Sequence, residues 1–285
     1  MRAVKSALVA TASVAAFVSV LGASPAMAGI PFTWDPGLIG LSSGGVTQFT
    51  ADDIVVSDFA TITLGPNTGT ASNPVYNSVS ESAILPITQF TLGGTKVAQG
   101  GSAYTLYFDV TAATSSISGT PASLVGKFNT LSYTLFGVTG GCTFNASLGG
   151  PSATCGGTKF TIATGGVSST AFGPGNNVSV TAGDPAAHAN VTIIPDSTNG
   201  AFFVSPNATS IANDLFISAF TNSAAQFFCG TTKCSFENPA ISAVVIKSTA
   251  GGGISLTAVP EPDTLAVFGL GLLGLGWFAR RRKIV

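Results

Sequence analysis

Short runs of alternating or β-branched residues recur about every ten residues, and this spacing constrains the fold more than any other feature of the sequence. In the run from 103 to 111, Leu106, Phe108 and Val110 each follow a more polar residue, as in a strand with one face in a core. Gly, Pro, Asn and Ser separate the runs. Evenly spaced short strands without long helical patterns predict an all-β fold, a β-sandwich or a jelly roll.

The segment Ile211–Phe220 fits a helical face as well as a strand, and the sequence leaves the two alternatives open. The expected strands are Val46–Thr50, Ala60–Leu64, Ile84–Leu92, Ala103–Thr111, Leu131–Val138, Lys159–Ala163, Val178–Ala182, Ala189–Ile194, Ala201–Val204 and Ala243–Thr249. Seventeen phenylalanines lie between Phe32 and Phe236, and we expect most of them in the core of this domain.

The chain begins with features of a secretory signal peptide. Arg2 and Lys5 precede an apolar run, and the small residues Ala26 and Ala28 predict cleavage before Gly29 by signal peptidase. The alternative is a membrane anchor that is never removed, but the run is short for a span. Residues 1–28 are therefore interpreted as a signal peptide and 29–258 as the mature β-rich domain.

Few charges occur in that domain. Between Gly29 and Ala258 there are five lysines, ten acidic residues and no arginine, so the net charge is 5 − 10 = −5. A protein that binds nucleic acid needs clustered cations to neutralise phosphates, so this composition excludes a nucleic-acid partner. Ser, Thr, Asn and Gly provide the polar surface instead, and such a surface is suited to hydrogen bonding with hydroxyl-rich polymers.

A second processing segment follows at 259–283. Pro260, Glu261 and Pro262 precede an apolar run at 264–279, which ends at Arg280, Arg281, Arg282 and Lys283. Sixteen helical residues extend about 24 Å, against roughly 30 Å of hydrocarbon in a bilayer. We therefore expect a single, marginal transmembrane helix that is inserted transiently in the inner membrane. Its basic tail favours the cytoplasmic side.

The order of these features resembles the PEP-CTERM sorting domain. The resemblance covers Pro-Glu-Pro, then Thr264-Leu265-Ala266, then the Gly/Leu-rich run 269–276, then the arginines. It implies cleavage near Pro-Glu-Pro by an exosortase, a membrane cysteine transpeptidase of Gram-negative bacteria that make exopolysaccharide. The alternative is a plain C-terminal membrane tail that stays attached, since hydropathy does not distinguish the two.

A weaker resemblance covers parts of the first hundred residues. The segments 32–36, 49–54 and 84–88 are similar to the flocculation-associated group of PEP-CTERM proteins. This similarity implies a role in holding cells within exopolysaccharide flocs or biofilm, at the cell surface or in the extracellular matrix. It brings no catalytic residue with it.

Four cysteines form two local groups, Cys142 with Cys155 and Cys229 with Cys234. Export permits disulfides, and four cysteines allow three connectivities. The two local pairings are favoured because each pair lies in a Gly/Thr-rich segment that can fold back. A zinc site is the competing interpretation, but the spacing fits zinc ribbons poorly.

The inventory of catalytic residues is small, so the chain is not expected to be an enzyme or to hold a cofactor. His188 is the single histidine, and no Gly-x-Ser-x-Gly nucleophile elbow accompanies it. Asp52, Asp53 and Asp58 form an acidic group that is compatible with calcium or with a solvated turn. Trp34 and the four tyrosines are the candidates for stacking on sugar rings.

These observations lead to one functional hypothesis and two alternatives. We expect an exported matrix protein that supports exopolysaccharide-associated aggregation through its surface. The alternatives are a secreted carbohydrate-binding module and a matrix polysaccharide hydrolase.

Overall fold

The computed structural model describes residues 30–101, 103–120, 123–167, 177–181, 187–205, 207, 215–222, 225–235 and 238–257. Strands dominate this part of the chain, and its single helical element is the 3₁₀ turn η1 (Pro36–Ile39). None of the helical structure in the described ranges is long and apolar enough to cross a membrane. The all-β fold expected from the sequence is confirmed.

Three long antiparallel pairings organise the first half of the chain, β3 with β5, β5 with β7 and β7 with β8. The strands are β1 (Phe32–Trp34), β2 (Phe49–Ala51), β3 (Asp53–Leu64), β4 (Val75–Tyr76), β5 (Val79–Leu92), β6 (Thr95–Val97), β7 (Thr105–Thr120), β8 (Ser123–Val138), β9 (Cys142–Ser147), β10 (Gly150–Cys155), β11 (Lys159–Val167), β12 (Asn177–Thr181), β13 (Ala187–Thr198), β14 (Phe203–Ser205), β15 (Leu215–Asn222), β16 (Ala225–Cys229), β17 (Thr232–Cys234) and β18 (Ala243–Thr257).

The predicted strands all coincide at least in part with observed ones, but several boundaries differ. Strands β7 and β8 are longer than expected and pair with each other along almost their whole length. Val46 lies in the loop before β2 rather than in a strand. The ambiguous segment is a strand from Leu215 onward, because β15 pairs with both β13 and β18.

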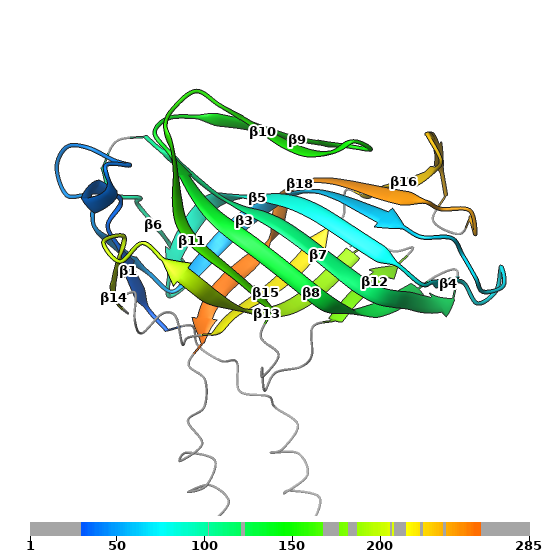
Figure 1. Cartoon of the computed structure of the whole chain (residues 1–285). Coiled ribbons are helices and arrows are strands. Elements are labelled where there is room, and N and C mark those ends of the chain that lie inside the picture. The colour runs from blue at the N-terminus through cyan, green and yellow to red at the C-terminus, as the bar shows by residue number, and fades with distance from the viewer. Residues whose placement is uncertain are drawn as a thin grey trace, which may run out of the picture.

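The main sheet closes on itself through its pairings. Starting at β7, the next hydrogen-bonded neighbour is β8, which is followed by β11 together with β12. The order then continues through β13, β15, β18, β3 and β5, and β5 pairs with β7 again. Strands β11 and β12 share one position, since each pairs with a different half of β8 and of β13. Figure 1 shows these long strands side by side.

The inner side of this closed sheet holds a continuous apolar core. Alternate residues of β3, β5, β7, β8 and β18 are buried there, as the period-two pattern requires. Ile54, Leu85, Phe108, Leu135 and Ile246 are examples, each at most 6% exposed.

A small sheet of β14, β1 and β2 packs against one end of the closed sheet. Its centre is Trp34, whose ring lies 5.4 Å from that of Phe90 and 5.0 Å from that of Phe202. Tilted and edge-on aromatic packing of this kind adds to the free energy of area burial. The small sheet therefore fixes the chain around Trp34 to the end of β5.

A disulfide-linked hairpin covers part of the outer side. Strands β9 and β10 pair along their whole length, from Cys142 opposite Cys155 to Ser147 opposite Gly150. A disulfide joins Cys142 and Cys155. The hairpin packs over an outward cluster of Ile84, Tyr107 and Val138, which would otherwise be exposed apolar surface. Figure 1 shows β9 and β10 as a separate layer above β5.

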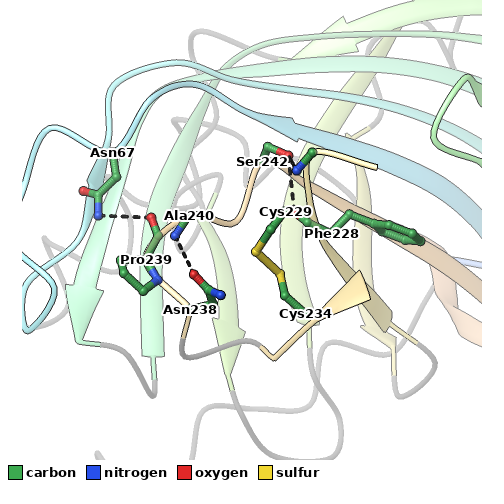
Figure 2. Close-up of a disulfide and its surroundings, with 9 residues drawn as sticks. Asn67, Phe228, Cys229, Cys234, Asn238, Pro239, Ala240 and Ser242 are labelled. Atoms are coloured by element: carbon green, nitrogen blue, oxygen red, sulfur yellow. Dashed lines mark hydrogen bonds between the residues drawn. A yellow bond between two sulfur atoms is a disulfide. The ribbon is translucent and has the colours of Figure 1, made fainter. Parts of the chain in front are cut away.

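The second disulfide joins Cys229 and Cys234 across the β16–β17 hairpin (Figure 2). Ser242 fixes this hairpin to the start of β18, because its backbone N–H donates to the Phe228 carbonyl at 2.8 Å and its hydroxyl accepts from the Gly230 N–H. Both bonds are the local pairings favoured from the sequence, and the described cysteines include no free thiol.

Two carboxylic acids point to the inner side. Asp58 is buried between Val56 and Ala60 on β3 and lies opposite Ser248 of β18. Glu81 on β5 occupies an inward position between Val79 and Ala83. Burial, and then the negative charge of Asp58, raise the pKa of Glu81 to about 8 from its ordinary 4.5.

Removal of the Cys142–Cys155 bond should destabilise the protein. The Cys142→Ala, Cys155→Ala double variant should lose about 3 kcal/mol of unfolding free energy, because the open loop regains conformational entropy in the unfolded chain. Chemical denaturation of the variant and of its parent measures this loss.

Thiol alkylation of the unfolded, unreduced parent should label none of the four cysteines, and labelling of all four would contradict the bonded state.

The inward position of Glu81 predicts that stability falls as pH rises. A carboxylic acid whose pKa is higher in the folded than in the unfolded state stabilises the fold at any pH below its unfolded-state pKa. This stabilisation is lost as the pH rises through the folded-state pKa. Unfolding free energy should therefore decrease by up to about 1.4 kcal/mol per pH unit between 4.5 and about 8. Glu81→Gln should remove this slope, whereas Asp109→Asn, an exposed neighbour on β7, should retain it. Equal slopes in the two variants would show that Glu81 is not responsible.

Candidate functional site

The outer side of β3, β5, β7 and β8 carries a group of exposed hydroxyl side chains. They lie outward because the residues between them, such as Ile62, Ala83, Ala112 and Tyr133, point into the core. We call this surface the hydroxyl face, and its residues are Thr63, Ser80, Ser82, Thr111, Thr130 and Ser132.

The strand register places these residues in rows across the sheet. Thr63 is opposite Ser80, and in the next row Ser82 is opposite Thr111. Thr111 is in turn opposite Ser132. Neighbouring strands are roughly 4.8 Å apart, and alternate residues along one strand are roughly 6.7 Å apart. The hydroxyl groups therefore form an array that spans four strands.

The β9–β10 hairpin borders this array. Thr61 on β3 donates its hydroxyl hydrogen to the carbonyl of Ser147, near the hairpin tip, at 2.7 Å. Thr61 is opposite Ser82, so the hairpin ends where the hydroxyl face begins. The apolar outer residues Ile84 and Tyr107 lie under the hairpin, while the hydroxyl-bearing part stays exposed.

The chemistry of the hydroxyl face is that of neutral hydrogen bonding. Each Ser or Thr hydroxyl donates one hydrogen and accepts at two lone pairs, as does a sugar hydroxyl. A single such bond contributes only about 1 kcal/mol net. An extended polymer that crosses several strands makes many of them, directly or through water. The array is therefore suited to a long, hydroxyl-rich ligand.

The aromatic residues expected to stack on sugars do not lie at the surface. Trp34, Tyr76, Tyr107 and Tyr133 are each at most 5% exposed, and they belong to the core or lie beneath the hairpin. The hydroxyl of Tyr104 is buried as well, and burial raises its pKa. The stacking hypothesis is wrong for these residues, because the sheet uses its large aromatic side chains for packing.

The three aspartates considered for calcium are separated by the fold. Asp52 accepts a hydrogen bond from the Gly93 N–H at 2.7 Å, whereas Asp58 points into the core six residues later. The pKa of Asp53 is raised, first by burial and less by the charge of Asp52, while a hydrogen bond from the Ile54 N–H opposes the shift. Within the described ranges, no three Asp, Glu, His or Cys residues form a group that could hold a metal ion.

His188 lies within strand β13. On β13 it pairs with Ser179 of β12 and with Thr221 of β15.

The signal-cleavage residues Ala26, Ala28 and Gly29 lie outside the described residues, as do Pro260, Glu261, Pro262 and Arg280 to Arg282.

The rows of hydroxyl groups were not identified from the sequence, although a signal for them is present. Ser80 and Ser82 flank an inward residue, and Thr130 and Ser132 flank Leu131 in the same way. Each pair alone is an ordinary feature of an exposed strand face. Only the register between strands brings the pairs into one surface.

The sorting segment follows directly from the closed sheet. Strand β18 ends at Thr257, where it pairs with Leu215 of β15. Near this end Ile254 pairs with Ile54, and Ile54 pairs with Phe90. The start of β3, the end of β5 and the end of β18 thus meet at one end of the molecule, together with the small sheet and η1 (Figure 1). We call it the exit end.

Comparison with known proteins identifies the sorting segment and little else. A model of the PEP-CTERM protein-sorting motif matches residues 258–283. No curated protein and no solved structure matches the chain. The match begins at the residue after β18 and includes both the Pro-Glu-Pro sequence and the arginines. The chain therefore carries a PEP-CTERM sorting motif, which is the mark of an exported protein that is sorted by exosortase.

Proposed function

We propose that this protein is a structural component of the exopolysaccharide matrix, where it supports cell aggregation by binding polysaccharide on its hydroxyl face. The sorting motif supports delivery to the cell surface of a Gram-negative bacterium. The array of Thr63, Ser80, Ser82, Thr111, Thr130 and Ser132 is the observation that carries the polysaccharide assignment. The protein acts through an extended surface and needs no reaction centre.

The residue inventory supports a binding role over hydrolysis. Glycoside hydrolysis uses two carboxylic acids at a defined separation across the scissile bond. The mature domain has two glutamates, of which Glu81 points to the core. Asp109 is exposed beside the hydroxyl face, but it is opposite Thr134 and Ile84 rather than a second acid. A carbohydrate-binding module is the related alternative, and it differs in having no part in aggregation.

The hydroxyl face is tested by removing its hydroxyl groups without changing its shape. In the Ser82→Ala, Thr111→Val, Ser132→Ala triple variant we expect affinity for the isolated native polysaccharide to fall at least roughly ten-fold, since each lost hydrogen bond contributes about 1 kcal/mol. Co-sedimentation of the mature protein with that polymer measures the affinity.

A matched variant controls for this change. Thr232→Val with Ser235→Ala removes two exposed hydroxyl groups near β17, away from the hydroxyl face, and should leave binding unchanged. Equal binding by the triple variant and its parent would contradict the proposed surface. Release of shorter sugars from the polymer would favour the hydrolase instead.

Processing is tested separately from binding. Mature protein from the cell surface should lack residues 1–28 and everything after the Pro260 to Pro262 region, because both end segments are removed during export and sorting. Intact-mass measurement checks both ends.

Replacement of Pro260, Glu261 and Pro262 by alanine should leave unprocessed protein in the inner membrane. Recovery of surface protein that still contains Arg280 would sink the processing claim.

A further inference from the structure

Exposed aliphatic side chains gather at the exit end of the molecule. Six large apolar side chains of the described residues are exposed, and four of them belong to the small sheet, its loops or the β5–β6 turn. Val46 and Leu38 are the most exposed, at 81% and 62%. The four are Leu38, Val46, Leu92 and Val204.

The loops that carry these side chains are fixed in position. Asp35 accepts hydrogen bonds from the Gly37 N–H and from the Thr47 hydroxyl, which connects the two ends of the loop containing Leu38 and Val46. Leu92 precedes the turn Gly93–Gly94, where both residues have positive φ, as a two-residue hairpin loop of this twist requires. The apolar side chains are therefore held outward by ordered backbone.

The sorting segment keeps this end near a membrane. Six residues, 258–263, separate Thr257 from the apolar run that begins at Thr264. They span at most about 20 Å when fully extended. The sixteen residues of β7 extend roughly 50 Å along the sheet. While the precursor is membrane-inserted, the exit end therefore stays closer to the bilayer than the far end, where Val125 is exposed.

Charge does not provide the attraction at this end. Asp35, Asp52 and Asp53 lie there, and Lys96 on β6 is a nearby cation. Asp35 accepts a hydrogen bond within its own loop, and Asp52 accepts one from the Gly93 N–H in the β5–β6 turn. A polybasic surface binds anionic headgroups and weakens with salt, whereas exposed aliphatic side chains gain free energy from the apolar boundary of any bilayer.

We propose that the exit end is a lipid-docking surface, on which the precursor rests against the outer leaflet of the inner membrane until exosortase cuts the tail. The inference depends on the proposed sorting through residues 258–283. Leu38, Val46 and Leu92 enter the lipid interface, and docking holds the segment 258–263 at the level of the bilayer surface. Cleavage removes the tether, and the released domain then leaves the membrane because three or four aliphatic side chains alone bind weakly.

The test uses full-length precursor from a host that lacks exosortase, reconstituted in vesicles of phosphatidylethanolamine with a minor share of phosphatidylglycerol. The vesicles contain a phosphatidylethanolamine with a photoreactive group, and labelled residues are mapped by peptide mass spectrometry. Labels should concentrate in the tail, in residues 36–47 and in residues 92–95, at low and at high salt. The Leu38→Ser, Val46→Ser, Leu92→Ser variant should lose roughly ten-fold of the exit-end label, since burial of one Val or Leu already corresponds to about that factor.

The control variant Val125→Ser, Leu148→Ser changes two exposed side chains outside the exit end and should keep the parental label. Tail label without exit-end label would overturn the docking proposal and leave the sorting proposal intact. Exit-end label that requires added exosortase, or cross-links between copies at this end, would overturn it in favour of a protein partner. Absence of label from both the tail and the exit end would contradict the sorting proposal as well.

Discussion

Hydrogen bonding of β18 on both of its edges is the constraint on which the rest of the structure depends. One edge pairs with β3 from Ala243 to Ile254, and the other pairs first with β16 and then with β15. The last strand before the sorting segment thus closes the main sheet. A strand that is hydrogen-bonded on both sides leaves no open edge there for association with another chain. The tail therefore extends from a part of the fold that cannot be removed without opening the whole sheet.

This position of β18 has consequences for processing. The proposed cleavage near Pro260 to Pro262 would leave every residue of β18 on the mature protein, so the domain would lose none of its pairings when the tail is removed. A load applied at the new C-terminus would act along β18 and across its ladders with β3 and β15. Many backbone hydrogen bonds then share the load. Under the proposed function, a matrix protein attached through its C-terminus would benefit from this arrangement, whichever acceptor it is joined to.

Much of the fold could be predicted from residue alternation, and the functional surface could not. Alternation located β3, β5, β7, β8 and β18, because inward and outward residues differ in polarity along each strand. Trp34 and the tyrosines are expected at the surface because their polar edges tolerate water, but five phenylalanine rings pack around Trp34, and Tyr107 lies beneath the β9–β10 hairpin. The position of Thr111 opposite both Ser82 and Ser132 depends on strand register, and register follows from long-range closure that a local pattern does not contain.

The scarcity of charge on the hydroxyl face has an energetic consequence for ligand binding. An outer strand face in an ordinary domain carries Lys and Glu, which keep proteins apart and hold a shell of water. Here the outward positions 63, 80, 82, 111, 130 and 132 are all Ser or Thr, while the acidic Glu81 lies inward. Replacing charges by hydroxyl groups lowers the cost of desolvating the face when a neutral polymer approaches, because neutral polar groups cost much less to desolvate than ions. One compositional bias therefore favours a neutral ligand on the side of the sheet.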